Sequence, residues 1–280
     1  MHTYIILFQC KDKPGIVAKL SDFILKNQGN IIIADQYSTS LKNGHFFMRV
    51  EFDVDGKAQG MTTLGKGLSL IAKVFNAKAS LYEKDKPLRM GICVSQPQHC
   101  LAEILYLWRT GELNVDIPFV ISNFKNHKQF IEEQGVPFYF IPATKKDRRE
   151  KELLKLAIDK TDFLVLSRYM LILSNKFLKA YNKDIINIHH GFLPSFKGGN
   201  PYAQALKKGV KVIGATSHFV NESLDEGPII TQSVESVSHK DELADLIRKG
   251  KTLEKRSLVD AIRAYIDYRI IRHNNTTIVF

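Results

Sequence analysis

The pattern of apolar and polar positions predicts one order of strands and helices before residue 85 and a different order after it. Before that point four apolar runs have the length and composition of strands, at 3–10, 30–39, 45–54 and 77–84. Apolar residues recur at helical spacing in 16–29 and 61–75. The order β-α-β-β-α-β predicts a ferredoxin-like domain over residues 1–84, and the charged segment 83–89, which contains Pro87, predicts a linker.

From residue 88 strand-like and helix-like segments alternate with short loops. Strands are expected at 88–95, 117–123, 136–142, 162–167, 184–188, 211–220 and 228–237. Helices are expected at 97–112, 127–135, 149–160 and, as one long terminal helix, over most of 240–272. This alternation predicts an α/β domain with a parallel, doubly wound, Rossmann-like sheet over residues 85–280.

Composition narrows the class of protein. The 280 residues are 44% hydrophobic and 25% charged, which suits two compact domains, and no apolar run reaches the length of a membrane span. The first residues are typical of a strand rather than a secretory signal, and the few cysteines are typical of buried thiols in a reducing compartment. We therefore expect a cytoplasmic protein without a membrane partner.

The formal charge of +11 leaves two kinds of partner open, nucleic acid and a small polyanion. The dense basic run at 145–155 has no interleaved aromatic residue and no recognised nucleic-acid motif. A solvated helix face accounts for it, so we expect no nucleic-acid partner.

The segment 185–202, IINIHHGFLPSFKGGNPY, places polar groups at the end of an expected strand. Asn187 and His189 are two residues apart, so their side chains point to the same side, where open α/β sheets bind ligands. An amide beside an imidazole can stabilise a developing oxyanion, whereas each residue alone is more often only hydrogen-bonded. Gly198 and Gly199 favour a functional loop, because they keep bulky side chains away.

Asp225 lies in a second loop, LDEGPI, where Gly227 permits a tight return into the next strand. It is either an ordinary turn aspartate or a group that orients and deprotonates a water molecule. His189, His190 and His218 suggest a metal site, but adjacent histidines chelate poorly and no CxxC or HExxH motif is present. We expect no metal.

The stretch 187–232 resembles the catalytic segment of the folate-dependent formyltransferases. It carries their N-x-H, an LPSFKG-type loop and a Leu-Asp-x-Gly turn, in the same order and with matching spacing. The resemblance extends to LSRYMLIL at 166–173, similar to the folate-pocket segment, and to the TTIVF end. The segment KDKPGIVAKLSDFI at 11–24 is similar to an ACT domain, a small-molecule-sensing module.

With both parts present, the chain resembles the formyltetrahydrofolate deformylases over essentially its whole length. Glycinamide ribonucleotide formyltransferases have a glycine-rich phosphate loop where this chain reads CVSQPQHCL, and methionyl-tRNA formyltransferases add a C-terminal domain after the point where this chain stops. The resemblance implies hydrolysis of 10-formyltetrahydrofolate to formate and tetrahydrofolate, which balances the one-carbon pool for purine biosynthesis. Transfer of the formyl group to an amine acceptor from the same site is the alternative.

The resemblance implies a role for each candidate residue. Asn187 and protonated His189 stabilise the oxyanion, and Asp225 orients the water and accepts its proton. The implied folate pocket consists of Met170, Ile172, Leu173, Gly198 and Gly199. For Met170, packing in the core is the alternative. The resemblance implies 10-formyltetrahydrofolate as the substrate and no cofactor.

Three positions depart from the family pattern. Phe124 stands where relatives often have histidine, so the role of that histidine is lost or passes to His127. Gly191 replaces a usual serine, and Leu171 replaces a common arginine that would give one charged folate contact.

The ACT resemblance implies an effector site at the start of the first helix, at Asp12, Gly15 and Ile16. Free helical amides there suit a ligand carboxylate, and glycine and methionine, as metabolic neighbours of the one-carbon pool, are the expected effectors. The alternative is that Gly15 only shapes the turn. The edges of a ferredoxin-like sheet are exposed, so we expect a homo-oligomer, a dimer or tetramer, assembled partly through residues 1–84.

Overall fold

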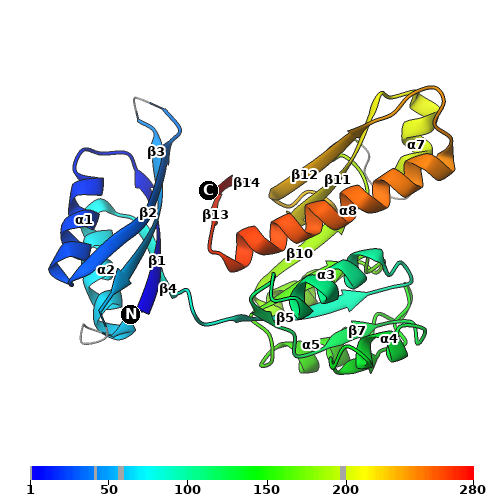
Figure 1. Cartoon of the computed structure of the whole chain (residues 1–280), viewed down its shortest axis with the longest axis horizontal. Helices are drawn as coiled ribbons and strands as arrows, with labels where there is room; N and C mark the ends of the chain where they lie inside the picture. Colours follow the sequence, from blue (N-terminus) through cyan, green and yellow to red (C-terminus); the bar gives the residue numbers. More distant parts are fainter. Residues whose placement is uncertain (1, 41–42, 56–59, 196–199) are drawn as a thin grey trace. The chain divides into compact units, whose positions relative to one another are not determined.

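The computed structural model describes residues 2–40, 43–55, 60–195 and 200–280. The chain divides into two compact units (Figure 1). One consists of Met1–Pro87 with Asp267–Phe280, and the other of Leu88–Ile266. Each unit has its own core of buried apolar side chains.

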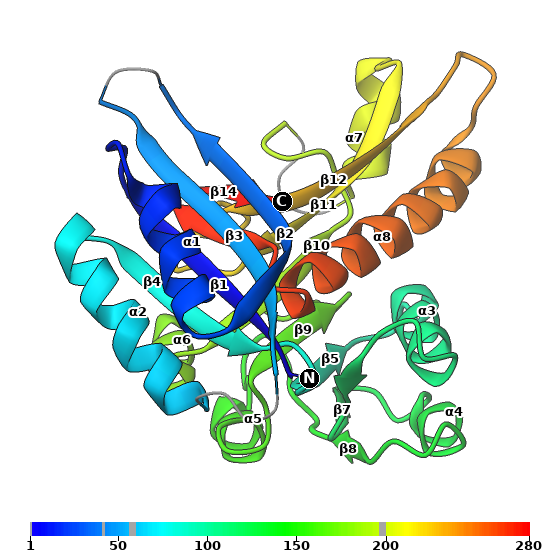
Figure 2. The same ribbon diagram turned by 60° about the vertical axis from the view of Figure 1, so that its left-hand side comes forward.

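The first unit is a four-stranded antiparallel sheet with two helices on one face (Figure 2). Its strands, in the order β2-β3-β1-β4, are β1 (His2–Lys11), β2 (Gly29–Ser38), β3 (His45–Val54) and β4 (Lys78–Glu83). Its helices are α1 (Ile16–Lys26) and α2 (Met61–Phe75). Leu20, Leu64 and Leu68 are buried because helical spacing places them on the faces that pack against the sheet. The predicted ferredoxin-like order is confirmed.

A C-terminal hairpin, β13 (Ile270–His273) and β14 (Thr276–Val279), packs on the other face of this sheet. Arg49 donates to the carbonyl oxygens of Asp267 at 3.1 Å and Tyr268 at 3.2 Å, and the rings of Tyr82 and Tyr268 stack with centroids 4.0 Å apart. These contacts join residues far apart in sequence. Because of these contacts, Asp267–Phe280 belongs to the first unit, whereas the sequence placed one boundary between residues 84 and 85 and everything after it in the second domain.

The second unit contains a mixed sheet whose main path runs β12-β11-β10-β9-β5-β7-β8. Its strands are β5 (Leu88–Val94), β6 (Val115–Asp116), β7 (Val120–Ser122), β8 (Phe138–Phe140), β9 (Phe163–Ser167), β10 (Asp184–His189), β11 (Val212–Phe219) and β12 (Ile229–Ser236). The predicted parallel pairing is confirmed from β8 to β10, whereas β11 and β12 are antiparallel. Antiparallel strands need no crossover helix, and the loop 220–228 joins β11 directly to β12.

The helices of this unit are α3 (His99–Arg109), α4 (Lys128–Glu132), α5 (Glu150–Ala157), α6 (Asn175–Tyr181), α7 (Pro201–Lys208) and α8 (Leu243–Ile266). The sequence did not predict α6 and α7, which are too short to show a clear helical period. The terminal helix expected over 240–272 ends at Ile266, because Tyr268 adopts a left-handed φ of +51° that stops helical hydrogen bonding. Among the described residues, no helix has both the length and the apolarity that crossing a membrane requires.

Candidate active site

The register of β10 against β11 brings the predicted polar residues together. Asn187 lies opposite His218, and His189 lies opposite Thr216. Residues directly opposite in an antiparallel pair project to the same face, so all four side chains share one face of the sheet. Asn187 Nδ2 lies 3.1 Å from His218 Nε2.

Asp225 completes this group from the loop between β11 and β12. Its carboxylate lies 3.3 Å from His189 Nδ1 and 3.8 Å from His218 Nε2. Its φ of +55° lies in the left-handed region, a strained conformation that concentrates at functional sites. Gly227 makes the turn possible, because a Cβ there would lie 1.7 Å from the carbonyl oxygen of Phe219. The structure therefore places Asn187, His189 and Asp225 in one site.

His218 links Asn187 to Asp225, a role that the sequence did not predict. Its Nδ1 lies 2.9 Å from the carbonyl oxygen of Phe219, so Nδ1 must carry the proton and donate. Burial lowers the pKa of His218, which leaves Nε2 as an acceptor for one hydrogen of the Asn187 amide. The second amide hydrogen can then point at a ligand carbonyl. The two-residue spacing of Thr216 and His218 was the available sequence signal.

A cavity of about 430 Å³ lies over these residues, within the size range of small-molecule sites. Met170 and Ile172 line it with side chains that are 49% and 54% exposed, although both are apolar. Leu173 lines the cavity and is also part of the hydrophobic core. The expected pocket residues Gly198 and Gly199 lie outside the described residues. An apolar wall beside a few polar groups suits a flat heteroaromatic ligand.

Ser95, directly after β5, holds the segment that carries Met170. Its hydroxyl accepts from the Met170 amide at 3.0 Å and donates to Asn123 Oδ1 at 2.8 Å. Its carbonyl oxygen lies 2.7 Å from His127 Nε2. His127 is thus a buried support for Ser95 and lies behind the cavity wall rather than in it. Phe124 stays partly exposed.

The other two departures from the family pattern lie in or near the cavity. Leu171 lines it and adds apolar surface to its wall. The carbonyl oxygen of Gly191 accepts from the Thr216 hydroxyl at 2.9 Å, so the backbone at this position is fixed without a side chain.

Within the described part of the chain, one group has the spacing of metal ligands: His99, Cys100 and Glu254, whose ligand atoms lie within 4.8 Å of one another. Glu254 already bonds to His99 Nε2 at 2.8 Å and to the Tyr202 hydroxyl at 2.7 Å. Burial raises the pKa of the Cys100 thiol, and a protonated thiol is a poor metal ligand. The group is better described as a hydrogen-bonded cluster.

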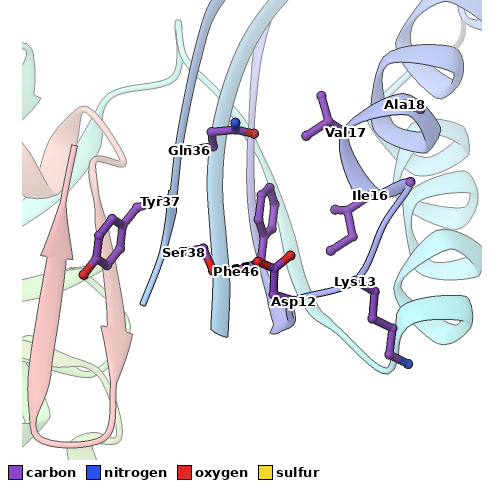
Figure 3. Close-up of a pocket in the computed structure, with 10 residues that line it drawn as sticks. Asp12, Lys13, Ile16, Val17, Ala18, Gln36, Tyr37, Ser38 and Phe46 are labelled. Atoms are coloured by element: carbon purple, nitrogen blue, oxygen red, sulfur yellow. Dashed lines mark hydrogen bonds between the residues drawn. The ribbon is translucent and has the colours of Figure 1, made fainter. Parts of the chain in front are cut away.

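A second cavity, of about 670 Å³, lies in the first unit at the start of α1 (Figure 3). Asp12, Gly15 and Ile16 line it, as the sequence predicted for an effector site. The Asp12 carboxylate accepts from the Ser38 hydroxyl at 2.7 Å, and Lys13 lies beside it. Gly15 has a φ of +90°, which L side chains rarely adopt, so this position requires glycine.

Comparison with known families agrees with both halves of this description. The ACT domain model matches residues 4–66, and the formyl transferase model matches residues 88–262. The fold and site therefore define a formyl transferase domain that follows an ACT domain.

Full-length relatives narrow the family. A formyltetrahydrofolate deformylase of Arabidopsis thaliana, named as mitochondrial, is 45% identical and covers 98% of this chain and 87% of its own. That of Synechocystis is 43% identical, with 99% and 98% covered. The crystal structure of the Pseudomonas syringae formyltetrahydrofolate deformylase is 37% identical, with a TM-score of 0.94 and coverage of 100% and 95%. The chain belongs to the formyltetrahydrofolate deformylase family.

The hydrogen bonds of His218 predict how the histidines titrate. Burial lowers the pKa of His190 to about 4, so this ring should stay neutral at pH values well below the usual histidine pKa of about 6.5. The pKa of His218 should also lie below that usual value, and its neutral form should carry the proton on Nδ1. Both bind fewer protons when folded than when unfolded, so their contribution to stability is lost as the pH falls below the unfolded value. Long-range ¹H–¹⁵N NMR of labelled histidines measures both, with exposed His239 as the reference. An Nε2-protonated His218 would contradict the proposed bond to Asn187.

Proposed function

We propose that the protein hydrolyses 10-formyltetrahydrofolate to formate and tetrahydrofolate at the cavity of the second unit. One observation carries the proposal: Asn187, His189 and Asp225 converge at the floor of a cavity whose wall carries the exposed apolar side chains of Met170 and Ile172. Membership of the deformylase family supports the same substrate. No cofactor or metal enters the proposed reaction.

The formyl carbonyl oxygen receives the amide hydrogen that Asn187 does not give to His218. His189, when protonated, donates a second hydrogen bond to that oxygen. Both donors act most strongly on the charge that develops when water attacks the formyl carbon, and removing one such donor costs on the order of a hundredfold in rate or more.

Asp225 orients the water and accepts its proton as the new carbon–oxygen bond forms. The carbon–nitrogen bond then breaks, and the leaving folate nitrogen takes up the proton that Asp225 accepted. The remaining hydroxyl proton of the formic acid goes to solvent, so one water is consumed for each formate released. The ring of the folate lies along Met170, Ile172 and Leu173. Lys145 and Arg148, which line the cavity, provide positive charge for the carboxylates of the substrate tail.

We also propose a cytoplasmic role in supplying formate and free folate for purine biosynthesis. The three cysteines, Cys10, Cys93 and Cys100, are buried and unpaired, which suits a reducing compartment. Arg149, within the basic run, pairs with Asp147 and Glu152, which supports a solvated face rather than a nucleic-acid surface.

The proposal predicts formate release from 10-formyltetrahydrofolate without any amine acceptor. Asp225→Asn should lower kcat by about a hundredfold or more, because a general base contributes that much, while folate affinity stays nearly unchanged. Formate release and calorimetric affinity measure the two effects. Glu226→Gln, an exposed carboxylate next in sequence, is the matched control.

Turnover that appears only with an amine acceptor would assign the protein to the transferases instead. Equal losses of affinity and kcat/KM in Asp225→Asn would make Asp225 a binding residue. Activity should also survive dialysis against EDTA, and loss that zinc restores would introduce a metal.

We propose that the first unit assembles the chain into a homo-oligomer, a dimer or tetramer, through β2. This strand lies at the edge of its sheet, and Ile31, Ile32 and Ile33 are 36%, 48% and 40% exposed despite being apolar. An unpaired edge with apolar side chains pairs readily with a second copy. Ile32→Lys should therefore lower the mass measured by analytical ultracentrifugation. Tyr106→Lys, on α3, changes a side chain that is 63% exposed and should leave the mass unchanged. A monomeric wild type would refute the proposal.

We propose that the cavity at α1 binds an amino acid, with glycine and methionine as the first candidates. The effector carboxylate would meet the free amides at the start of α1. The rate of deformylation should respond to one of these amino acids, and Gly15→Val should abolish the response, because valine cannot easily adopt a φ of +90°. If none of the twenty amino acids changes the rate of deformylation, the first unit serves only to assemble the oligomer. A response that survives Gly15→Val would place the effector elsewhere.

A further inference from the structure

Arg168 is a largely buried cation that the proposed mechanism does not use. It directly follows β9, and its φ of +59° is strained for any residue other than glycine. Its side chain is 13% exposed and lines the same cavity as His189 and His190. Strain that fixes a charged side chain at a catalytic cavity is a reason to look for its ligand.

The hydrogen bonding of this guanidinium is incomplete. Arg168 Nε lies 3.5 Å from Oε2 of Glu254, close enough for an ion pair but without hydrogen-bond geometry. Over the ranges that the structure describes, neither Nε nor Nη1 has a hydrogen-bond partner, although both atoms are buried. Buried N–H groups normally find an acceptor in the protein, in water or in a ligand.

Glu254 is bound to other groups and cannot satisfy Arg168 alone. Its two oxygens bond to His99 Nε2 at 2.8 Å and to the Tyr202 hydroxyl at 2.7 Å. Burial by itself raises the pKa of Glu254, but the bond from His99 and the charge of Arg168 outweigh it and keep the pKa low. Gly250, one turn earlier on α8, makes room for the ring, because a Cβ there would lie 2.1 Å from Tyr202. The packing thus fixes Glu254 on one side of the guanidinium.

His190 lies between this cluster and the proposed catalytic residues. Its ring centroid is 5.4 Å from that of His189 and 6.1 Å from that of Tyr202. Burial, and then the charge of Arg168, lower its pKa to about 4, so it is neutral at neutral pH. A neutral imidazole does not repel the guanidinium. Arg168 is therefore a cation that lines the same cavity as the proposed reacting groups and has two nitrogen atoms without a hydrogen-bond partner.

We propose that Arg168 binds a small carboxylate, namely the formate that forms beside Asn187, His189 and Asp225. Hydrolysis turns a neutral formyl group into a carboxylate, and an oxygen of that carboxylate can accept a charge-assisted hydrogen bond from the unpartnered Nε–H or Nη1–H of Arg168. The inference rests on the proposed function. The glutamyl carboxylates of the substrate are the other carboxylates that could bind a cation in this cavity. The side chains of Lys145 and Arg148, which are less buried than Arg168, are better placed to bind them.

Direct titration of the full chain with sodium formate, followed by ¹³C NMR at constant ionic strength, tests the proposal. With three non-hydrogen atoms, formate should bind with a Kd on the order of 1–10 mM. Arg168→Gln should weaken binding by about tenfold or more, and Arg168→Lys, which keeps the charge without the fork, by less. Arg149→Gln is the matched control: Arg149 also has a left-handed φ, of +50°, but its guanidinium pairs with Asp147 and Glu152.

Glu254→Gln should change the affinity for formate in the opposite direction. This variant also tests the proposal if Arg168→Gln does not fold. Removing the carboxylate charge leaves Arg168 uncompensated, so formate binding should tighten by several-fold. A purely structural role predicts unchanged or weaker binding in both variants. The proposal is overturned if wild-type protein binds no formate at tens of millimolar, if Arg168→Gln binds as well as wild type, or if Glu254→Gln binds no more tightly.

p-Aminobenzoylglutamate distinguishes the two sources of carboxylate. It should leave formate binding to the wild type unchanged, and displacement of formate would assign Arg168 to the substrate tail. The titration needs no turnover, so its result is independent of the proposed hydrolysis. Failure of that function would show instead as no formate release from the folate substrate.

Discussion

The antiparallel pairing of β10 with β11 determines where the amide and the imidazoles of the proposed site lie, and the loop after β11 brings Asp225 to them. Because opposite residues share a face, the pairing of Asn187 with His218 and of His189 with Thr216 places the amide and both imidazoles together. A slip of β11 by one residue would turn Thr216 and His218 to the other face of the sheet and separate them from Asn187 and His189. Thr216 also fixes the next loop, since its hydroxyl donates to the Gly191 carbonyl and accepts from the Leu193 amide.

Burial around this pairing keeps His190 and His218 neutral. The lowered pKa values of His190 and His218 keep both rings neutral, so neither adds a cation that competes with His189 for the Asp225 carboxylate. The neutral form of His218 is also what allows Nε2 to accept from Asn187. The packing of His218 therefore controls its protonation. Exposing this ring to water would raise its pKa, and a protonated Nε2 could no longer accept the hydrogen bond from the Asn187 amide.

The sequence predicts local features of this arrangement well and long-range contacts poorly. Asn187 and His189 could be singled out because strand periodicity fixes their relative direction, and Asp225 because Gly227 marks a turn. The cluster of Arg168, Glu254 and Tyr202 could not, because its members come from three elements with no common spacing.

The same limit applies to the first unit. The sequence analysis assigned Asp267–Phe280 to the catalytic domain, because nothing near those residues shows that Arg49 binds the backbone at Asp267 and Tyr268.

The end of β5 shows how the catalytic unit differs from a protein that binds phosphate at this position. The loop after a parallel strand commonly offers free amides to a ligand. Here the Ser95 amide donates to the Arg168 carbonyl oxygen at 3.3 Å, and its hydroxyl and carbonyl bind Met170, Asn123 and His127. The amide and the hydroxyl of Ser95 therefore hold the backbone at Arg168 and Met170, and no hydrogen-bond donor of Ser95 remains for a phosphate. In the reaction proposed above the acceptor is water, which carries no phosphate, so this loop fits the proposed hydrolysis better than transfer to a phosphorylated acceptor.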